Sequence, residues 1–100
     1  MSEAVRFEWD DAKDRRNQQE HGLSFSEAGQ LFQGGQDYLE IFDIAHSRDE
    51  DRFIAIGEIH RRVAVVLFTE REENVIRIIG ARMATNRERD RYRDHMDRYG

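Results

Sequence analysis

Cysteine and proline are both missing from this 100-residue chain. Without cysteine, the protein has no disulfide bond and no thiolate metal site. No proline-rich, serine-rich or repeated stretch marks a linker, so we expect residues 1–100 to form a single domain. Long apolar runs are also missing, because none approaches the roughly 20 residues that cross a bilayer. Residues 1–5 lack the basic and apolar stretches of a secretion signal, and we expect a cytoplasmic protein that does not bind membranes.

Lysine is nearly absent as well, because Lys13 is the single lysine among 16 basic residues. The net charge is −5, which argues against a general nucleic-acid coat protein. The other basic residues are arginines, whose planar guanidinium group suits phosphates and carboxylates. A genome rich in G and C would produce the same excess, so the position of each arginine matters more than the number.

Three helices are expected from their end signals. The first begins at a cap on Asp10 or Asp11, runs to about residue 21 and ends at Gly22, which suits the left-handed position after a helix. Capping-box patterns, in which a serine or threonine precedes a glutamate by three residues, begin the second helix at Ser24 and the third at Thr85. The second helix ends at residues 34–35.

Four strands are expected between the second and third helices, at residues 37–43, 52–59, 62–69 and 75–82, after a short extended segment at 5–9. The apolar run Val63–Phe68 suits a central strand that is covered on both faces. Short connections, such as the turn at His60-Arg61, imply antiparallel pairs, because parallel pairs need long crossovers. The predicted fold is therefore α+β, with two N-terminal helices, a three- to four-stranded antiparallel sheet and a C-terminal helix packed on it.

Four polar or aromatic residues recur every four positions in the first helix: Trp9, Lys13, Asn17 and His21. This spacing places them along one side of a helix, where they could stack a base, hold a phosphate and move a proton. The alternative is structural, with Trp9 in the core, Lys13 and Asn17 in solvent, and His21 capping the end of the helix. Spacing alone favours this second interpretation.

Three arginines surround the last predicted hairpin, namely Arg71, Arg77 and Arg82. Arg77 has apolar neighbours in its strand, so it needs an anionic partner. Strand alternation places Arg77 and Arg82 on opposite faces unless a bulge intervenes. The three residues could equally lie on an exposed face and pair with nearby glutamates.

Other motifs are weaker. His46, His60 and His95 are scattered and no metal-binding spacing appears, so we expect no metal site and no cofactor. The basic residues between Arg87 and Arg98 alternate with acidic ones, which indicates a solvated helix held by ion pairs.

Several short segments occur in a specific order. They are Phe7–Asp10, Lys13, Asn17, His21–Phe25, Glu27-Ala28, Arg52–Gly57, Thr69–Arg71, Ile76–Ile79, Ala81-Arg82, Ala84-Thr85, Arg87–Arg89 and Tyr92. Together they resemble the BrnT family, the toxins of bacterial toxin–antitoxin systems, over nearly the whole chain.

The resemblance implies a RelE-like fold and a ribonuclease that cleaves RNA without a metal ion and inhibits translation. It also implies neutralisation by a BrnA-type antitoxin. Operator DNA would be bound by the antitoxin, and the protein would reach the DNA only through it. Because the first-helix stripe and the arginines match the family pattern position by position, the resemblance favours function at these sites. The implied catalytic residues are His21, Arg71, Arg77 and Arg82, and the implied RNA-binding residues are Trp9, Lys13, Asn17 and Arg62.

The sequence departs from the family pattern in a few places. Glu20 stands where a lysine is common, Arg61 replaces a glycine, and Gly80 and Met83 replace a serine and a lysine. The loss of two basic residues keeps a second hypothesis open, in which the chain is a catalytically impaired antitoxin-binding module or a transcriptional co-repressor. For a ribonuclease of this net charge we expect a local positive patch.

Overall fold

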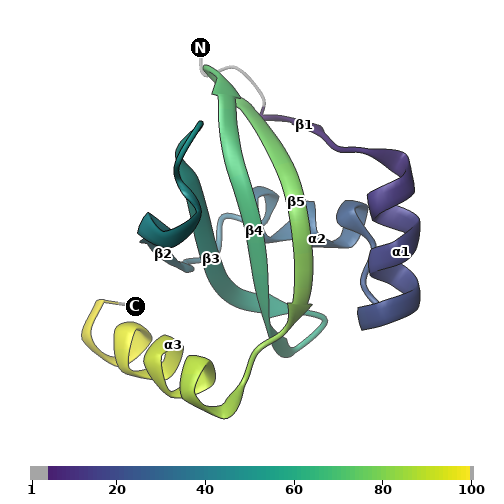
Figure 1. The fold of residues 1–100 in the computed structure, drawn as a ribbon. Coiled ribbons are helices and arrows are strands. Elements are labelled where there is room, and N and C mark those ends of the chain that lie inside the picture. Colours follow the sequence, from purple (N-terminus) through teal and green to yellow (C-terminus); the bar gives the residue numbers. More distant parts are fainter. Residues whose placement is uncertain (1–4, 100) are drawn as a thin grey trace.

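The computed structural model describes residues 5–99. The absence of a secretion signal was predicted from residues 1–5, and residues 1–4 lie outside the described part of the chain. In chain order (Figure 1) the elements are β1 (Arg6–Glu8), α1 (Asp11–His21), α2 (Phe25–Gln33), β2 (Leu39–Phe42), the 3₁₀ turn η1 (Ile44–His46), β3 (Arg52–Ile59), β4 (Arg62–Glu72), β5 (Val75–Met83) and α3 (Asn86–Tyr99). None of the described helices is long and apolar enough to span a membrane.

The helices begin and end where local signals predict. Asp10 caps α1, because its carboxylate accepts a hydrogen bond from the backbone N–H of Lys13. Gly22 follows the helix with a φ of 71°, in the left-handed region that glycine adopts without strain. Both capping boxes form, at Ser24 before α2 and at Thr85 before α3.

The sheet has five strands in the order β1-β5-β4-β3-β2. β1 runs parallel to β5, while the other neighbouring pairs are antiparallel. The prediction of a purely antiparallel sheet of three to four strands was therefore wrong. The short extended segment at the beginning of the chain joins the sheet as an edge strand, and the elements between β1 and β5 supply the long connection that a parallel pair requires.

β4 lies at the centre of the sheet and is covered on both faces, as its apolar run predicts. Ala64, Val66 and Phe68 belong to a core that also contains the buried residues of α2. Val65 points to the opposite face and packs in a second core with Tyr92 of α3. Figure 1 shows α2 behind the strands and α3 near the end of the sheet at which β5 ends. The sheet therefore has helices on both faces, but α3 reaches only one end of its face.

α1 is attached to the sheet by a polar side chain. Asn17 is its only buried residue. The Asn17 amide donates to the carbonyl oxygens of Ala81 and Leu23, both at 2.8 Å, and accepts from the N–H of Ala81 at 3.2 Å. Because β1 pairs with β5 only as far as Arg77, the edge of β5 is open at Ala81, and the Asn17 side chain takes the place of a neighbouring strand there.

A β-bulge in β5 decides where the arginines point. Leu67 pairs with Gly80 and Phe68 pairs with Ile78, so Ile79 is an extra residue between them. Arg77 therefore lies opposite Thr69 and Arg82 opposite Val65. Thr69 and Val65 are four residues apart on β4 and share a face. Of the two possibilities left open by the sequence, the bulge holds, and both arginines lie on the α3 face.

We expect Asn17→Asp to lower the free energy of unfolding by about 2–4 kcal/mol, because it removes two donors and faces two buried carbonyl groups with a carboxylate. Urea denaturation followed by circular dichroism measures the change. Gln18→Glu makes the same amide-to-carboxylate change at the next, exposed position and serves as the control. Equal stability of the two variants would contradict the role assigned to Asn17.

Candidate functional site

A groove of about 260 Å³ opens on the α3 face of the sheet. Its lining combines apolar side chains of the sheet with charged side chains, namely Ile54, Leu67, Ile79, Phe53, Asp43, His46, Arg52 and Arg82. The bulge contributes Ile79, the extra residue of β5. Because α3 covers only one end of this face, the apolar residues of the groove remain half-buried instead of being sealed in a core.

Arg82 is held by Glu88 in a two-pronged ion pair, with nitrogen–oxygen distances of 2.7 and 2.8 Å. Hydrogen bonds from Arg82, together with one from the N–H of Thr85, lower the pKa of Glu88 to about 2 despite its partial burial. The same carboxylate raises the pKa of Arg82. Glu88 thus has two tasks, because it closes the capping box of α3 and fixes the guanidinium group at the rim of the groove.

His46 and Asp43 form a second polar pair on the groove. The Nδ1 atom of His46 lies 2.9 Å from an Asp43 carboxylate oxygen. The imidazole is 68% exposed and the Asp43 side chain 16% exposed. An ionised carboxylate only accepts hydrogen bonds, so Nδ1 donates and Nε2 is left to accept a proton. This arrangement resembles a general base held in one orientation by an acidic residue.

The loop that carries His46 is tied to the sheet at both ends. Asp43 donates from its N–H to the carbonyl of Arg52 at 2.8 Å, and Arg52 donates from its N–H to the hydroxyl of Ser47 at 2.9 Å. The buried hydroxyl of Thr69 donates to the carbonyl of Asp51 at 2.6 Å. These bonds fix the backbone around His46 although its side chain reaches solvent.

His46 and Arg52 were not predicted as site residues. The only local signal was the spacing of Asp43 and His46, three residues apart, in a segment that otherwise indicates a polar loop. Their position beside Arg82 depends on the pairing of β3 with β4 and of β4 with β5, which no local pattern reveals.

The other two predicted catalytic arginines lie elsewhere. Arg77 pairs with Glu8 of β1 at 3.1 Å, which supplies the anionic partner that its apolar surroundings require. Arg71 lies 3.8 Å from Glu50, near the β4–β5 turn. Arg82 pairs with Val65, six residues from Arg71 along β4, or about 20 Å at the rise of a strand. The structure therefore does not bring Arg71, Arg77 and Arg82 together at one point.

The predicted stripe on α1 is divided between the core and solvent. Trp9 is half-buried against the main core, with its indole edge-on to Phe25 at a centroid distance of 6.3 Å. Lys13 is exposed, and no carboxylate among residues 5–99 forms an ion pair with it. The Lys13 ammonium group is therefore open to solvent, whereas the Trp9 indole serves chiefly in packing.

The remaining two stripe residues also differ from each other. Asn17 is buried, with its amide committed to the backbone of two other segments, which leaves it no free donor for RNA. His21 follows one helical turn later and is exposed, and its Nε2 atom lies 3.9 Å from a Glu20 carboxylate oxygen. No interaction in the described structure joins His21 to Arg71, Arg77 or Arg82.

Arg62, the last predicted RNA-binding residue, lies at the beginning of β4 and lines a separate pocket beside α3. Across residues 5–99, no three histidine, aspartate or glutamate side chains gather closely enough to hold a metal ion.

Comparisons with known proteins identify the family. A family model described as the ribonuclease toxin BrnT of type II toxin–antitoxin systems matches residues 9–88. The chain is also similar to the solved structure of the Brucella abortus ribonuclease toxin BrnT, with a TM-score of 0.65 and 24% sequence identity. That match covers 83% of this chain and 100% of the other, and at this identity it supports the fold alone. No curated protein matches the chain.

Glu88→Gln should lower stability at neutral pH but hardly at acid pH. The pKa of Glu88 is depressed in the folded protein, so its contribution is present above about pH 4.5 and is lost as the pH falls toward 2. Solvent screens the partly exposed pair, and we expect a loss of about 1–2 kcal/mol at pH 7, falling to less than half of that by pH 3. Urea unfolding at both pH values tests this, with the exposed Glu73→Gln as control. A loss that is the same at both pH values would contradict it.

Proposed function

The chain belongs to the BrnT family of ribonuclease toxins of type II toxin–antitoxin systems, and from this premise we propose that it is an endoribonuclease that cleaves RNA without a metal ion and thereby inhibits translation. The observation that carries the proposal beyond the family is the groove, in which Arg82 and the His46–Asp43 pair line one half-apolar cavity. Such a cavity offers a charge stabiliser, a proton acceptor and an apolar surface for a base.

The chemistry needs few protein groups, because RNA carries its own nucleophile. Removal of the proton from a 2′-hydroxyl lets that oxygen attack the adjacent phosphorus, and the bond to the 5′-oxygen then breaks as that oxygen takes up a proton. The phosphorane between these steps gains negative charge, which a fixed guanidinium group stabilises more than it stabilises the ground state. Arg82 is our candidate for this task, with Arg77 further along the same face as a contact for a neighbouring phosphate.

The proton acceptor is assigned to His46. Imidazole exchanges protons near neutral pH, and the bond to Asp43 keeps the Nε2 atom of His46 available. His21, which the family resemblance implies, stays a candidate on α1, where it follows the buried Asn17 by one helical turn. Lys13 on the same helix and Trp9 just before its beginning would guide the RNA strand toward the sheet. Arg71 lies too far along β4 to act on the same phosphate.

We further propose that the partner is a BrnA-type antitoxin, which neutralises the toxin in the cytoplasm and alone contacts operator DNA. Residues 1–100 would act as one toxin domain. One observation favours the binding-only alternative, in which the chain is a catalytically impaired antitoxin-binding module or a co-repressor. Each of Arg71, Arg77 and Arg82 is already paired with a carboxylate, so no unpaired guanidinium among them awaits a phosphate.

Induction of the gene alone should arrest growth and degrade cellular RNA, and co-expression of the neighbouring antitoxin gene should restore growth. The purified protein should cleave RNA at the same rate with and without a chelator, because the nucleophile and the charge stabiliser need no metal. Absence of arrest and of cleavage would favour the binding-only alternative, and strict dependence on a metal would contradict the mechanism.

Two variants of the Arg82–Glu88 pair serve as matched controls for that experiment. Arg82→Gln removes the guanidinium and should lower the cleavage rate by about 10²–10³-fold. Glu88→Gln removes the negative charge but keeps a side-chain oxygen that can accept a hydrogen bond from Arg82, so cleavage should fall much less. If the pair served only to hold α3, both variants would lose activity to a similar extent.

His46→Asn should lower the rate of RNA cleavage by about 10²–10⁴-fold, as expected for loss of a general base. Asp43→Asn should have a smaller effect and should change the pH profile, because it removes the orienting carboxylate. The comparison variant is His21→Asn, measured with the same RNA over the same pH range. Undiminished cleavage by His46→Asn, with loss in His21→Asn, would move the proton transfer to α1.

A further inference from the structure

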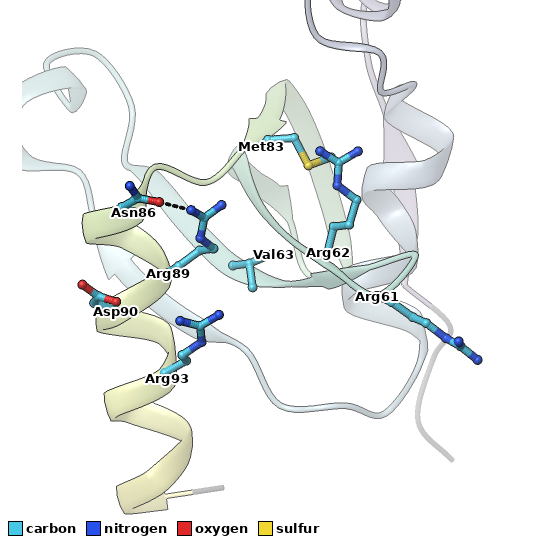
Figure 2. Close-up of a pocket in the computed structure, with 8 residues that line it drawn as sticks. All are labelled: Arg61, Arg62, Val63, Met83, Asn86, Arg89, Asp90 and Arg93. Carbon is cyan, nitrogen blue, oxygen red and sulfur yellow. Dashed lines mark hydrogen bonds between the residues drawn. The ribbon is translucent and has the colours of Figure 1, made fainter.

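A second, larger pocket of about 550 Å³ lies between α3 and the hairpin that joins β3 to β4. Figure 2 labels the residues that line it, which are Arg61, Arg62, Val63, Met83, Asn86, Arg89, Asp90 and Arg93. We call this site the arginine pocket. It is distinct from the groove, because the two share no lining residue.

The arginine pocket concentrates positive charge in an acidic chain. It contains four arginines and a single carboxylate, that of Asp90. Within residues 5–99, no carboxylate lies within 4.0 Å of the guanidinium groups of these four arginines, whereas Arg71, Arg77 and Arg82 each have one. Like charges held close together repel one another, and a bound anion would relieve that repulsion.

The fold fixes the positions of the arginines from two sides. The turn before β4 is tight, with φ values of 53° and 66° at His60 and Arg61, and it places Arg62 at the first position of the strand. On the other side, α3 is anchored by Tyr92, which is buried in the second core. Arg89 and Arg93 therefore lie one helical turn apart on the flank of α3 that adjoins this anchor.

The view of the pocket shows how these side chains converge. The guanidinium groups of Arg89 and Arg93 extend from α3 toward Val63, and Arg89 is oriented by a hydrogen bond to the side chain of Asn86 (Figure 2). Arg62 stands on the opposite side beside Met83, while Arg61 extends away from the centre (Figure 2). Three guanidinium groups thus border a space with an apolar floor.

We propose that the arginine pocket binds phosphodiester groups of an RNA strand, next to the groove in which that strand is cleaved. This inference rests on the proposed function. Guanidinium groups match the geometry of phosphate oxygens, and proteins that hold single strands use a positively charged groove that follows the backbone of the strand. Met83 directly follows Arg82, so a strand that leaves the groove reaches the pocket around the first turn of α3.

The family match covers only part of this site, because Arg61 and Arg62 lie within the matched residues 9–88. The family model ends at residue 88, so Arg89 and Arg93 lie beyond it. Charge alternation along α3 predicts a helix neutralised by its own ion pairs. Only Arg98 shows such a pair, with Asp94 at 3.4 Å, among the described residues of α3, which leaves Arg89 and Arg93 to an external anion.

The test is binding of a short, labelled 2′-O-methyl oligoribonucleotide, which cannot be cleaved, to the full chain at several salt concentrations. The double variant Arg89→Gln/Arg93→Gln should weaken binding roughly tenfold at low salt and reduce the slope of log affinity against log salt by about 0.7 for each arginine lost. The matched control is Arg87→Gln/Arg91→Gln, which has the same charge change and spacing on the exposed side of α3. It should bind nearly as tightly as the unaltered protein.

Equal salt slopes for the two double variants would overturn the proposal, because the pocket would then contribute only general charge. A variant that binds RNA normally but escapes neutralisation by the antitoxin would also overturn it and would identify a docking site for an acidic protein segment. Cleavage of an unmodified oligoribonucleotide by the unaltered protein is measured in parallel. If the unaltered protein does not cleave RNA, the result counts against the proposed function. If it cleaves RNA but the two double variants have equal salt slopes, the result counts against the arginine pocket alone.

Discussion

The need to cover β4 on both faces organises the molecule. Its apolar residues alternate between two cores, so a helix must pack on each side of the sheet. α2 packs beneath the centre of the sheet, and α3 covers only one end of the other face. The rest of that face stays half-buried, and this is where the groove forms. The same constraint that stabilises the fold therefore leaves an open surface between η1 and α3.

Ion pairs and unpaired arginines have separate tasks on this surface. Glu8, Glu50 and Glu88 each hold an arginine that the family resemblance implies to be catalytic. Glu88 joins the cap of α3 to the rim of the groove, so the position of the helix and that of the Arg82 guanidinium are set together. The arginine pocket has no such partners. The acidic net charge of the chain thus coexists with a strongly basic site, because Asp90 supplies the only carboxylate among the residues that line it.

Local signals in the sequence predicted the parts of the fold that a few residues determine. The cap at Gly22, both capping boxes, the His60-Arg61 turn and the strand at 52–59 formed at the predicted positions. The parallel pairing of the edge strand was not predicted, and a bulge between Arg77 and Arg82 was only one of two possibilities, since both features depend on pairing between distant segments. The arrangement of the candidate site likewise depends on contacts between distant segments. Strand register puts Arg82 beside His46, and burial of Asn17 removes it from the expected RNA-binding surface.

The Asn17 amide also bears on whether a second chain can add to the sheet. An unpaired strand edge is a template onto which a second chain can add by hydrogen bonding. β1 covers one part of the β5 edge, and the Asn17 side chain occupies the backbone groups of Ala81 just beyond it. Strand addition is thereby blocked at that edge. In the described sheet, the edges left for strand addition are β1 and β2, which have only three and four residues and carry the charged side chains of Arg6, Glu8 and Glu40. A single buried side chain thus protects the part of β5 that β1 leaves uncovered.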